Sequence, residues 1–256
     1  MPASHRDGRG DELDARLEAL VRRYALSSFV ANKLRLLAQR LAADPLAPTS
    51  IRDLRAIVDR HLADSLVALE LDALRSARRP LDLGSGAGLP GLPLAAALPE
   101  ANFVLLESVG RKCAFMEQTA AACQISNVEV VHGRAESYEE GLRHHDVVTA
   151  RAVAGLDVTV EYAAPLLCVG GTFIAWGGKR SPEVEESAAR AAEVLGLGEF
   201  SVHGVVPFEG AAHLHLYLTS KVKETPSEFP RRPGVAAKRP LGRTTPRGRS
   251  SDRCGR

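Results

Sequence analysis

Hydrophobic residues recur at two different spacings along this chain, and the change from one to the other divides it. Over residues 11–76 apolar side chains return every three or four positions, which is the spacing of one face of an α-helix. From 77 to 222 short apolar runs alternate with helical stretches, which is typical of a parallel sheet connected by helices. We therefore expect a helical cap followed by an α/β core, with a disordered N-terminus at 1–10 and a basic, largely disordered tail at 223–256.

Three amphipathic helices are expected in the cap. The apolar face of the first carries Leu13, Leu17, Leu20, Val21 and Tyr24. The second helix is predicted over 29–41 and the third over 51–74, a length that allows a break. Thr49 or Ser50 is expected to cap the third helix, because each has a side-chain oxygen and follows a proline-rich stretch.

Seven strands and four helices are expected in the core. The predicted strands are 80–84, 102–107, 127–131, 145–149, 170–176, 200–206 and 212–220. The predicted helices are 90–98, 109–124, 155–166 and 181–196. The link between the last two strands is too short for a helix, so these strands should pair as an antiparallel hairpin. A parallel sheet that closes with one such hairpin resembles the methyltransferase variant of the dinucleotide-binding fold.

Glycines crowd the turn that ends the first predicted strand. Gly84, Gly86 and Gly88 alternate there before a predicted helix, and only bare main chain can approach a ligand so closely. Glu107 ends the next apolar run, 23 residues after Gly84, which is the spacing expected of a carboxylate that binds ribose hydroxyls. The pair predicts a nucleoside-bearing cofactor at the carboxyl ends of the parallel strands.

Three nucleoside cofactors compete for this turn. NAD is disfavoured because Leu89 occupies the third small position of its glycine motif, where a bulky side chain impairs helix packing. ATP is disfavoured because Leu92 and Pro93 stand where a Lys-Ser/Thr pair would hold phosphate and Mg²⁺. S-adenosylmethionine carries no phosphate and tolerates an acid such as Asp82 opening the turn. The residues therefore favour S-adenosylmethionine, with NAD and ATP behind it.

Two further segments are expected at the same rim. Residues 132–136 form a short turn after the third strand, where main-chain amides could meet an adenine edge. Arg151 follows the fourth strand. An arginine in that position is commonly a surface or helix-capping residue, but at the mouth of such a cleft a binding role is favoured.

Composition narrows the class of protein. A hydrophobic fraction of 45% with 25% charged residues is ordinary for a globular chain of 256 residues, so one main domain is expected. The longest uncharged stretches are short and interrupted by Pro or Gly, and the first residues lack the apolar core of a secretion signal. The four cysteines show no CxxC spacing. We expect a cytoplasmic protein without membrane span, metal or disulfide.

Charge is unevenly distributed along the chain. Residues 221–256 hold 11 Lys and Arg against 3 Asp and Glu, whereas the other 220 residues hold 22 against 28. A tail rich in arginine gathers phosphate by releasing counterions, which favours a nucleic-acid partner. The alternative is a solvated terminus that only improves solubility. If the tail contacts RNA, deleting 225–256 should weaken RNA binding and leave cofactor binding intact.

A polar cluster is expected on the third cap helix. His61 and Ser65 are four residues apart and share a helix face, with Asp64 beside them. The cluster could contact a substrate or only dock the cap on the sheet, and the sequence leaves both open. A Ser-His-Asp hydrolase is disfavoured because the chain has no GxSxG elbow. His213 and His215 share a strand face, but no third metal ligand is evident.

Taken together, these motifs resemble the ribosomal RNA small subunit methyltransferase G family, bacterial enzymes that methylate N7 of one guanine in 16S rRNA. The resemblance covers most of residues 10–241. It rests on the segments 61–66, 81–91, 107–112, 134–136, 149–152, 177–179 and 229–241. Each segment alone is weak, but the combination is specific. It implies a class I S-adenosylmethionine-dependent methyltransferase fold, α/β and Rossmann-like, with a seven-stranded sheet and an N-terminal helical cap.

The resemblance also implies site residues. The implied cofactor contacts are Gly84, Leu89, Ala135, Glu136 and Arg151, with Gly86 and Gly88 shaping the loop. Glu107 stands where the family usually has Asp, so the carboxylate is one methylene longer. No residue is expected to act as acid or base, since guanine N7 carries an exposed lone pair. Arg151, His61 and Asp64 are expected to position the reactants.

The implied partner is 16S rRNA or the 30S subunit, bound by a monomer. A cationic rim is expected from Arg111, Lys112, Arg134 and Arg151. Two rival functions remain open: a methyltransferase acting on a small molecule or protein, and a non-catalytic RNA-binding assembly factor with a vestigial cleft. Methyl transfer to ribosomal RNA separates all three.

Overall fold

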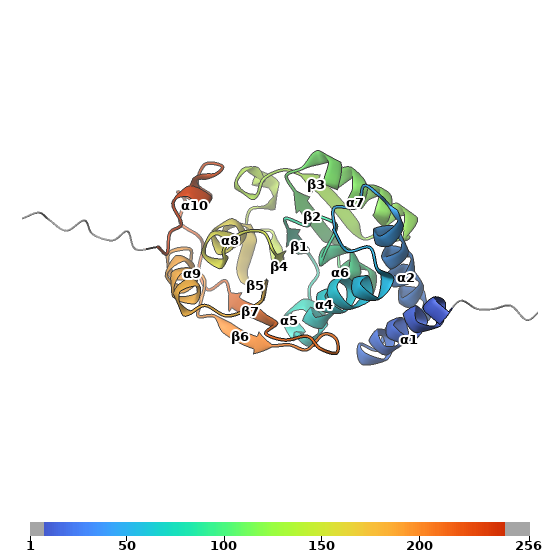
Figure 1. The fold of residues 1–256 in the computed structure, drawn as a ribbon. Coiled ribbons are helices and arrows are strands. Elements are labelled where there is room, and N and C mark those ends of the chain that lie inside the picture. Colours follow the sequence, from blue (N-terminus) through green and yellow to red (C-terminus); the bar gives the residue numbers. More distant parts are fainter. Residues whose placement is uncertain (1–7, 244–256) are drawn as a thin grey trace, which may run out of the picture.

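A seven-stranded sheet runs through the middle of the molecule (Figure 1), in a computed structural model that describes residues 8–243. The strands are β1 (Pro80–Leu83), β2 (Phe103–Glu107), β3 (Val128–His132), β4 (His145–Arg151), β5 (Leu167–Gly177), β6 (Ser201–Gly204) and β7 (His215–Ser220). Their order across the sheet is β3-β2-β1-β4-β5-β7-β6. The first five strands are parallel, and β7 is antiparallel to both β5 and β6. This confirms the predicted α/β class and its closing hairpin.

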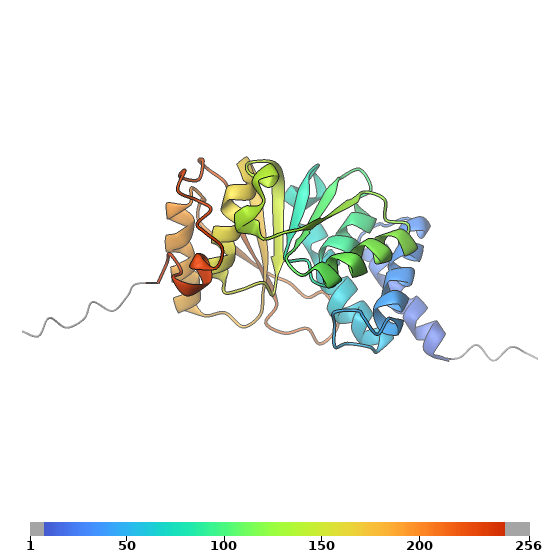
Figure 2. The same ribbon diagram turned by 90° about the horizontal axis from the view of Figure 1, so that it is seen from above.

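Helices cover both faces of the sheet (Figure 2). The main core helices are α6 (Gly91–Ala97), α7 (Gly110–Ala122), α8 (Leu156–Ala163) and α9 (Pro182–Val194). Successive strand residues serve opposite faces, as the period of two in a strand requires. Leu105 packs into the core beneath α6 and α7, whereas Leu106 packs into the core beneath α8 and α9. The sheet therefore separates two apolar layers, and its carboxyl edge lies between them.

The cap contains two long helices and one broken helix. Its elements are α1 (Gly8–Arg23), α2 (Ser28–Ala43), α3 (Leu54–Ile57), a π-helical turn (Val58–Ala63), α4 (Asp64–Leu66), a 3-10 turn (Val67–Glu70) and α5 (Asp72–Arg75). The predicted cap at Thr49 or Ser50 is wrong. The Asp53 side chain accepts the N–H of Ala56 at 2.9 Å and begins the helix, because a short carboxylate three residues upstream reaches that amide.

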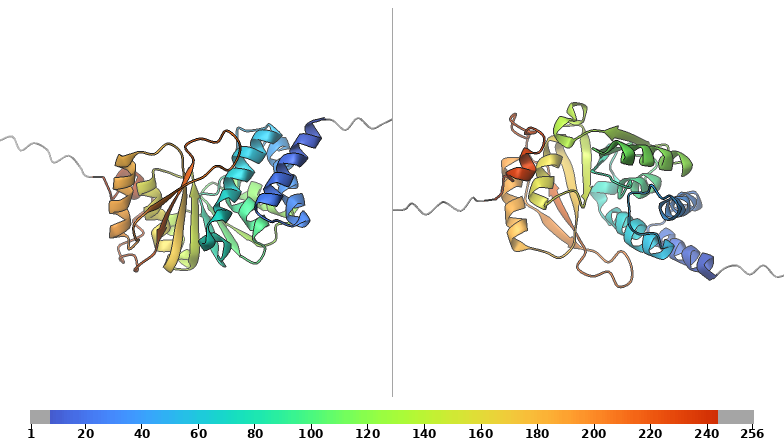
Figure 3. Two further views of the ribbon diagram at one scale, coloured as in Figure 1. Left: turned by 90° about the horizontal axis from the view of Figure 1, so that it is seen from below. Right: turned by 45° about the horizontal axis from the view of Figure 1, so that its top comes forward.

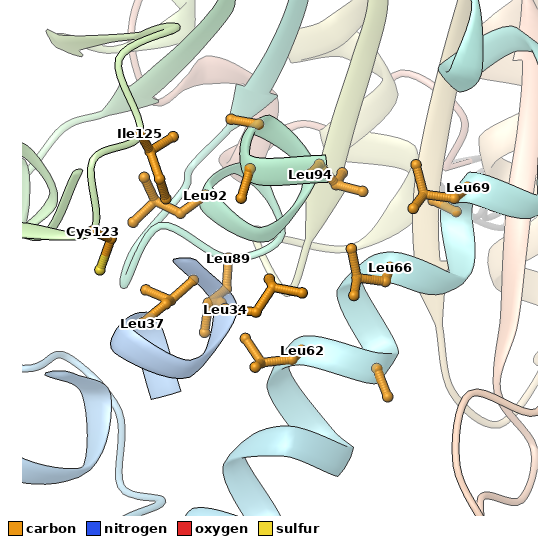
Figure 4. Close-up of a cluster of buried hydrophobic side chains, with 14 of the residues drawn as sticks. Leu34, Leu37, Leu62, Leu66, Leu69, Leu89, Leu92, Leu94, Cys123 and Ile125 are labelled. Carbon is orange, nitrogen blue, oxygen red and sulfur yellow. The ribbon is translucent and has the colours of Figure 1, made fainter. Parts of the chain in front are cut away.

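Leucine side chains from the cap fill the space above α6 (Figure 4). The close-up shows Leu34 and Leu37 of α2 facing Leu89, with Leu62 and Leu66 of the broken helix alongside. All five are buried. The cap therefore docks on the glycine turn and α6 through apolar packing rather than through a flexible hinge.

The observed strand boundaries differ from the predicted ones by up to three residues, in β5, which begins at 167 instead of 170, and in the closing hairpin. Its second strand is predicted from 212, but β7 begins at His215, because His213 adopts a φ of 60° that no regular strand accommodates. Of the predicted disordered N-terminus, residues 1–7 lie outside the described residues, and 8–10 form the first turn of α1. None of the helices within 8–243 is long and apolar enough to cross a membrane.

The basic tail, predicted as largely disordered, is folded over part of its length (Figure 3). Residues 223–243 run along the outside of α8 and α9 and include α10 (Val235–Lys238), which packs against α8. Phe229 and Leu241 pack against the core beneath those helices. Its composition did not reveal this packing because the partners lie on distant segments of the chain. The rest of the tail, 244–256, lies outside the described residues.

Candidate active site

The glycine turn joins β1 to α6 at the centre of the sheet. The N–H of Gly84 donates to the carbonyl of Leu106 at 2.8 Å, which ties the turn to the end of β2. Gly88 has a φ of 81°, and a Cβ built there would lie 2.3 Å from Leu92 Cδ1. A side chain at this position would therefore be strained and would collide with a buried leucine. Gly86 also has a positive φ, so the turn follows a path that three glycines make possible.

Asp82 holds this turn from beneath. Its carboxylate is fully buried and accepts the N–H of Gly91 at 3.1 Å and the hydroxyl of Thr149 at 2.9 Å. Burial raises the pKa of Asp82 to about 6, against the lowering effect of these hydrogen bonds. The acid that the sequence places at the opening of the turn therefore fixes the start of α6 and is not exposed to a ligand.

Glu107 closes the turn from the neighbouring strand. One of its carboxylate oxygens accepts the N–H of Gly86 at 3.0 Å, and the other accepts the N–H of Val109 at 2.9 Å. Lys112 approaches one of these oxygens at 3.7 Å. The Ser108 hydroxyl also donates to Glu107 at 3.4 Å, so three of the roughly four hydrogen bonds that a carboxylate can accept are used, and about one position is left for a further donor such as a hydroxyl group. Its position at the end of β2 fits the predicted ribose contact.

A cavity of about 210 Å³ opens beside this turn, and we call it the Gly84 cavity. Its walls come from the ends of β1 and β2, the segment after β3, the loop after β4 and α8. The lining residues are Leu83, Gly84, Leu106, Ser108, Gly133, Arg134, Ala135, Glu136, Val153 and Tyr162. Ala135 is buried, and Glu136 is partly exposed. Apolar walls with a few polar groups at one edge suit a flat heterocycle with a polar substituent.

A second cavity of about 190 Å³ adjoins the first, and we call it the Trp176 cavity. It is lined chiefly by the ends of β4 and β5 and the starts of α8 and α9, including Ala152, Trp176, Gly178 and Lys179. Val153 lines both cavities. Two molecules bound in the two cavities would therefore meet beside this valine.

A polar cluster fixes the cap to the carboxyl edge of the sheet. Arg151, at the end of β4, donates to Asp64 Oδ2 at 2.7 Å, and the two side chains are only 16% and 14% exposed. The indole N–H of Trp176 donates to the carbonyl of Asp64 at 2.7 Å. Asp64 thus receives hydrogen bonds from two strands. The structure brings Arg151 and Asp64 together, as the sequence expects of residues at one rim.

His61 faces the loop before the broken helix. Its Nε2 lies 2.8 Å from the hydroxyl of Thr49, and its Nδ1 lies 3.2 Å from the carbonyl of Arg60. Burial, reinforced by the charge of Arg151, lowers the pKa of His61 to about 4, so the ring is neutral at pH 7. Ser65 is buried and donates to the carbonyl of His61. These contacts favour the docking interpretation of the cluster over direct substrate contact.

The side chain of Leu89 belongs to the apolar contact between the glycine turn and the cap (Figure 4). Its side chain points toward α2 (Figure 4) and is 6% exposed. Of the predicted cofactor contacts, the lining of the Gly84 cavity includes Gly84, Ala135 and Glu136 but not Gly86, Gly88, Leu89, Glu107 or Arg151. The cofactor contact that the family resemblance implies for Leu89 would therefore come from its main chain. Its side chain packs against the cap (Figure 4).

The remaining predicted residues fall into two groups. In the cationic rim, Arg111 and Arg134 are exposed, whereas Lys112 and Arg151 approach carboxylates. His213 precedes β7 rather than sharing its face with His215. Within residues 8–243 no three His, Cys, Asp or Glu side chains gather in a way that could hold a metal ion. Cys113, Cys123 and Cys168 are free thiols, and Cys254 lies outside the described residues.

Comparison with known proteins decides the family. The family model of rRNA small subunit methyltransferase G matches residues 33–211. The chain belongs to this family. Curated proteins named ribosomal RNA small subunit methyltransferase G support the match. The one from Chloroflexus aggregans is 41% identical over 196 residues, which are 75% of this chain and 82% of that protein. The one from Deinococcus radiodurans is 40% identical, over 79% of this chain and 81% of that protein.

Solved structures of low sequence identity share the fold of this family member. The apo form of the S-adenosylmethionine-dependent methyltransferase SibL aligns with a TM-score of 0.54 at 16% identity, over 83% of this chain and 76% of that chain. The CurJ carbon methyltransferase aligns with a TM-score of 0.51 at 11% identity, over 82% of this chain and 71% of that chain. This member of a methyltransferase family thus has the Rossmann-like sheet of these structures.

Some residues that line the two cavities could not be identified from the sequence. Val153 and Tyr162 carry no motif that would single them out, because their role depends on where the segments after β4 and within α8 meet β1. Trp176 had a usable signal. It is the only tryptophan of the chain, and it stands near the end of a predicted strand, where Rossmann-like sheets bind ligands.

Proposed function

We propose that this protein transfers the methyl group of S-adenosylmethionine to N7 of a guanine in 16S rRNA of the small ribosomal subunit. The observation that carries the proposal is the Gly84 cavity at the glycine turn, with Glu107 bound to the Gly86 amide of that turn, in a chain of the rRNA small subunit methyltransferase G family. The rival function, methyl transfer to a small molecule or protein, would use the same donor site. It does not explain why the chain has a basic tail.

The residues present fit the proposed donor. Leu106 and Ala135 offer apolar walls for an adenine ring, and Glu107 offers carboxylate oxygens to ribose hydroxyls. The main chain at Gly84 lets the donor lie directly against the end of β1. Arg151, at the end of β4, is proposed to bind the carboxylate of the donor. When bound, S-adenosylmethionine supplies an electrophilic methyl group on a positively charged sulfur.

In the proposed mechanism the protein acts by positioning the guanine and the methyl donor. The N7 lone pair of guanine is available at pH 7, so no side chain needs to remove a proton first. The protein raises the rate by holding N7, methyl carbon and sulfur in line, which makes a bimolecular step effectively intramolecular. We assign the guanine to the Trp176 cavity, which shares Val153 with the Gly84 cavity, so that the two reactants meet beside this residue.

The charge of side chains near the Trp176 cavity affects the stability of the methylated product. Methylation at N7 leaves the guanine positively charged, so an unpaired cation nearby would oppose the reaction. The Arg151 guanidinium is paired with Asp64 at 2.7 Å, which reduces that opposition. We accordingly give Arg151, Asp64 and His61 positioning roles and no role in proton transfer.

The proposed partner is 16S rRNA, held through phosphate and shape. The chain has only 5% aromatic residues, too few for a platform that stacks single-stranded bases. The exposed Arg111 and Arg134, with basic residues of the tail that do not pair with buried carboxylates, would contact phosphates. We further propose that the protein acts as a cytoplasmic monomer.

Methyl transfer from tritiated S-adenosylmethionine tests the proposal. Label is expected in 16S rRNA or 30S subunits, and mapping of the modified nucleotide should place it on guanine N7. Label in a small molecule or protein, with none in rRNA, would support the first rival. Binding to 30S particles without methyl incorporation would support a non-catalytic assembly factor.

A further inference from the structure

The C-terminal residues 229–243, which we call the strap, are attached to the wall of the Gly84 cavity. The main-chain N–H of Gly234 donates to Glu136 Oε1 at 3.0 Å. Glu136 also lines the cavity, so one residue joins the strap to the wall of the proposed donor site. The residues meet across 98 positions of sequence, which makes the contact a tertiary one rather than a local turn.

An ion pair with a buried partner holds the strap in place. Arg231 donates from Nε to Glu161 Oε1 at 2.6 Å and from Nη2 to Glu161 Oε2. The side chain of Glu161 is 2% exposed and that of Arg231 is 22% exposed, so solvent screens the pair weakly. Two parallel bonds fix the orientation of a guanidinium as well as its position.

The same arginine sets the path of the strap toward Gly234. Arg231 Nη2 also donates to the carbonyl of Arg239 at 2.9 Å, which closes a loop around α10. Ala236 within this loop is 1% exposed and α10 packs against α8. The loop begins from Gly234, whose φ of 79° suits a glycine. Holding Arg231 therefore holds the amide that reaches Glu136.

Anchors farther along keep the strap on the surface of α9. The carbonyl of Gly242 accepts from Arg190 Nε at 2.8 Å, and a Cβ on Gly242 would lie 1.6 Å from the carbonyl oxygen of Ser187. Arg243 donates to the buried Asp157 at 3.1 Å. The strap is thus fixed at both ends, with the contact to Glu136 between them.

We propose that Arg231 is a positioning residue for the methyl donor: by holding the strap, it keeps the Gly234 amide on Glu136 and so fixes one wall of the Gly84 cavity. The inference rests on the proposed donor site. It changes the expectation that removal of the tail leaves cofactor binding intact, because the tail contains two parts. Residues 229–243 support the donor site, and the arginines beyond them serve RNA.

Calorimetric titration of the full-length protein with S-adenosylmethionine tests the inference. Arg231→Met should raise the dissociation constant at least about fivefold, while Arg232→Met, a matched change at the exposed neighbour, should stay within about twofold of wild type. Arg231→Lys keeps the charge but removes the two parallel bonds, so it should recover only part of the affinity. Wild-type affinity in Arg231→Met would overturn the inference.

Steady-state kinetics separate positioning from loss of folded protein. Arg231→Met should raise KM for S-adenosylmethionine and leave kcat at saturating donor within about twofold, since a smaller folded fraction would lower kcat instead. If Arg231→Met does not fold, Glu161→Gln loosens the same pair more gently and should show the same rise in KM. An unchanged KM in the variant that folds would contradict the inference.

Amide exchange in the wild type gives a test without any variant. Because coupling between two sites is reciprocal, bound donor should slow exchange at the Gly234 amide. Unchanged exchange at saturating S-adenosylmethionine would overturn the inference and leave the donor site itself standing. Absence of any heat with S-adenosylmethionine in the wild type would instead overturn the proposed function.

Discussion

Single buried carboxylates shape the site of this methyltransferase. Asp82 is the clearest case. Its burial disfavours the negative charge of the carboxylate, although the hydrogen bonds that the carboxylate accepts favour that charge. Burial raises its pKa from 3.8 to about 6, so the folded state binds its proton more tightly than the unfolded state does. Between those two pH values the folded state carries more protons, and the contribution of Asp82 to the free energy of unfolding falls as pH rises. Above pH 6 the cost is fully present, about 3 kcal/mol.

Asp82→Asn should remove this dependence. Its amide group can accept from Gly91 and donate to the Thr149 hydroxyl, so both hydrogen bonds survive with one role reversed. From about pH 4.5 to pH 7 the free energy of unfolding of the variant should rise relative to wild type by roughly 2 kcal/mol. Urea unfolding at several pH values measures the difference, and a difference that does not change with pH would contradict the assignment.

Arg151 has two possible duties, and one pair of variants separates them. Arg151→Met should weaken S-adenosylmethionine binding and also leave the Asp64 carboxylate unpaired, at a cost of about 1–3 kcal/mol. The double variant Asp64→Asn with Arg151→Met removes the unpaired charge, so thermal stability should recover while donor affinity should not. Recovery of both quantities would show that Arg151 only docks the cap.

At the scale of elements, the start of the broken cap helix depends on Asp53. Asp53→Ala should lower the free energy of unfolding by about 1 kcal/mol, because the N–H of Ala56 is left without its acceptor. Ser50→Ala is the matched control at the exposed residue that the sequence offered as a cap, and it should change the free energy by less than about 0.5 kcal/mol. Equal losses in the two variants would restore the sequence-based assignment.

The core strands and helices could be predicted, and the cap boundaries could not. A continuous apolar run placed β2 within one residue of its observed ends, because a buried parallel strand is apolar on both faces. The broken helix over 54–75 changes between α, π and 3-10 geometry, and its pattern of leucines is compatible with one continuous helix. The sequence pattern therefore did not place the changes in helix geometry.

The candidate site was predictable where main-chain chemistry dictates it. The glycine turn and Glu107 came from spacing alone, since close approach and a carboxylate at the next strand are local requirements. The hydrogen bond between Gly234 and Glu136 was not predictable, because nothing in a proline- and arginine-rich segment indicates a buried partner such as Glu161. Composition therefore suggested disorder for a segment that tertiary hydrogen bonds fix.

At the scale of the whole molecule, charge divides into an acidic body and a basic tail. Changing Arg247, Arg249, Arg253 and Arg256 to Gln removes four positive charges beyond the strap and keeps the chain length. Affinity for 16S rRNA should fall, and the slope of log affinity against log salt should become shallower by about 0.7 for each RNA phosphate that the variant no longer neutralises. S-adenosylmethionine binding should be unchanged. An unchanged salt slope would exclude RNA binding by these arginines.

One measurement tests the central claim most directly. The purified protein, S-adenosylmethionine labelled in its methyl group, and 30S subunits or 16S rRNA lacking the modification are incubated together, and the modified nucleotide is then mapped. We predict that label enters a single guanine and that the modified base is 7-methylguanine. Absence of label from rRNA in a preparation that binds S-adenosylmethionine, or label at another atom, would contradict the account.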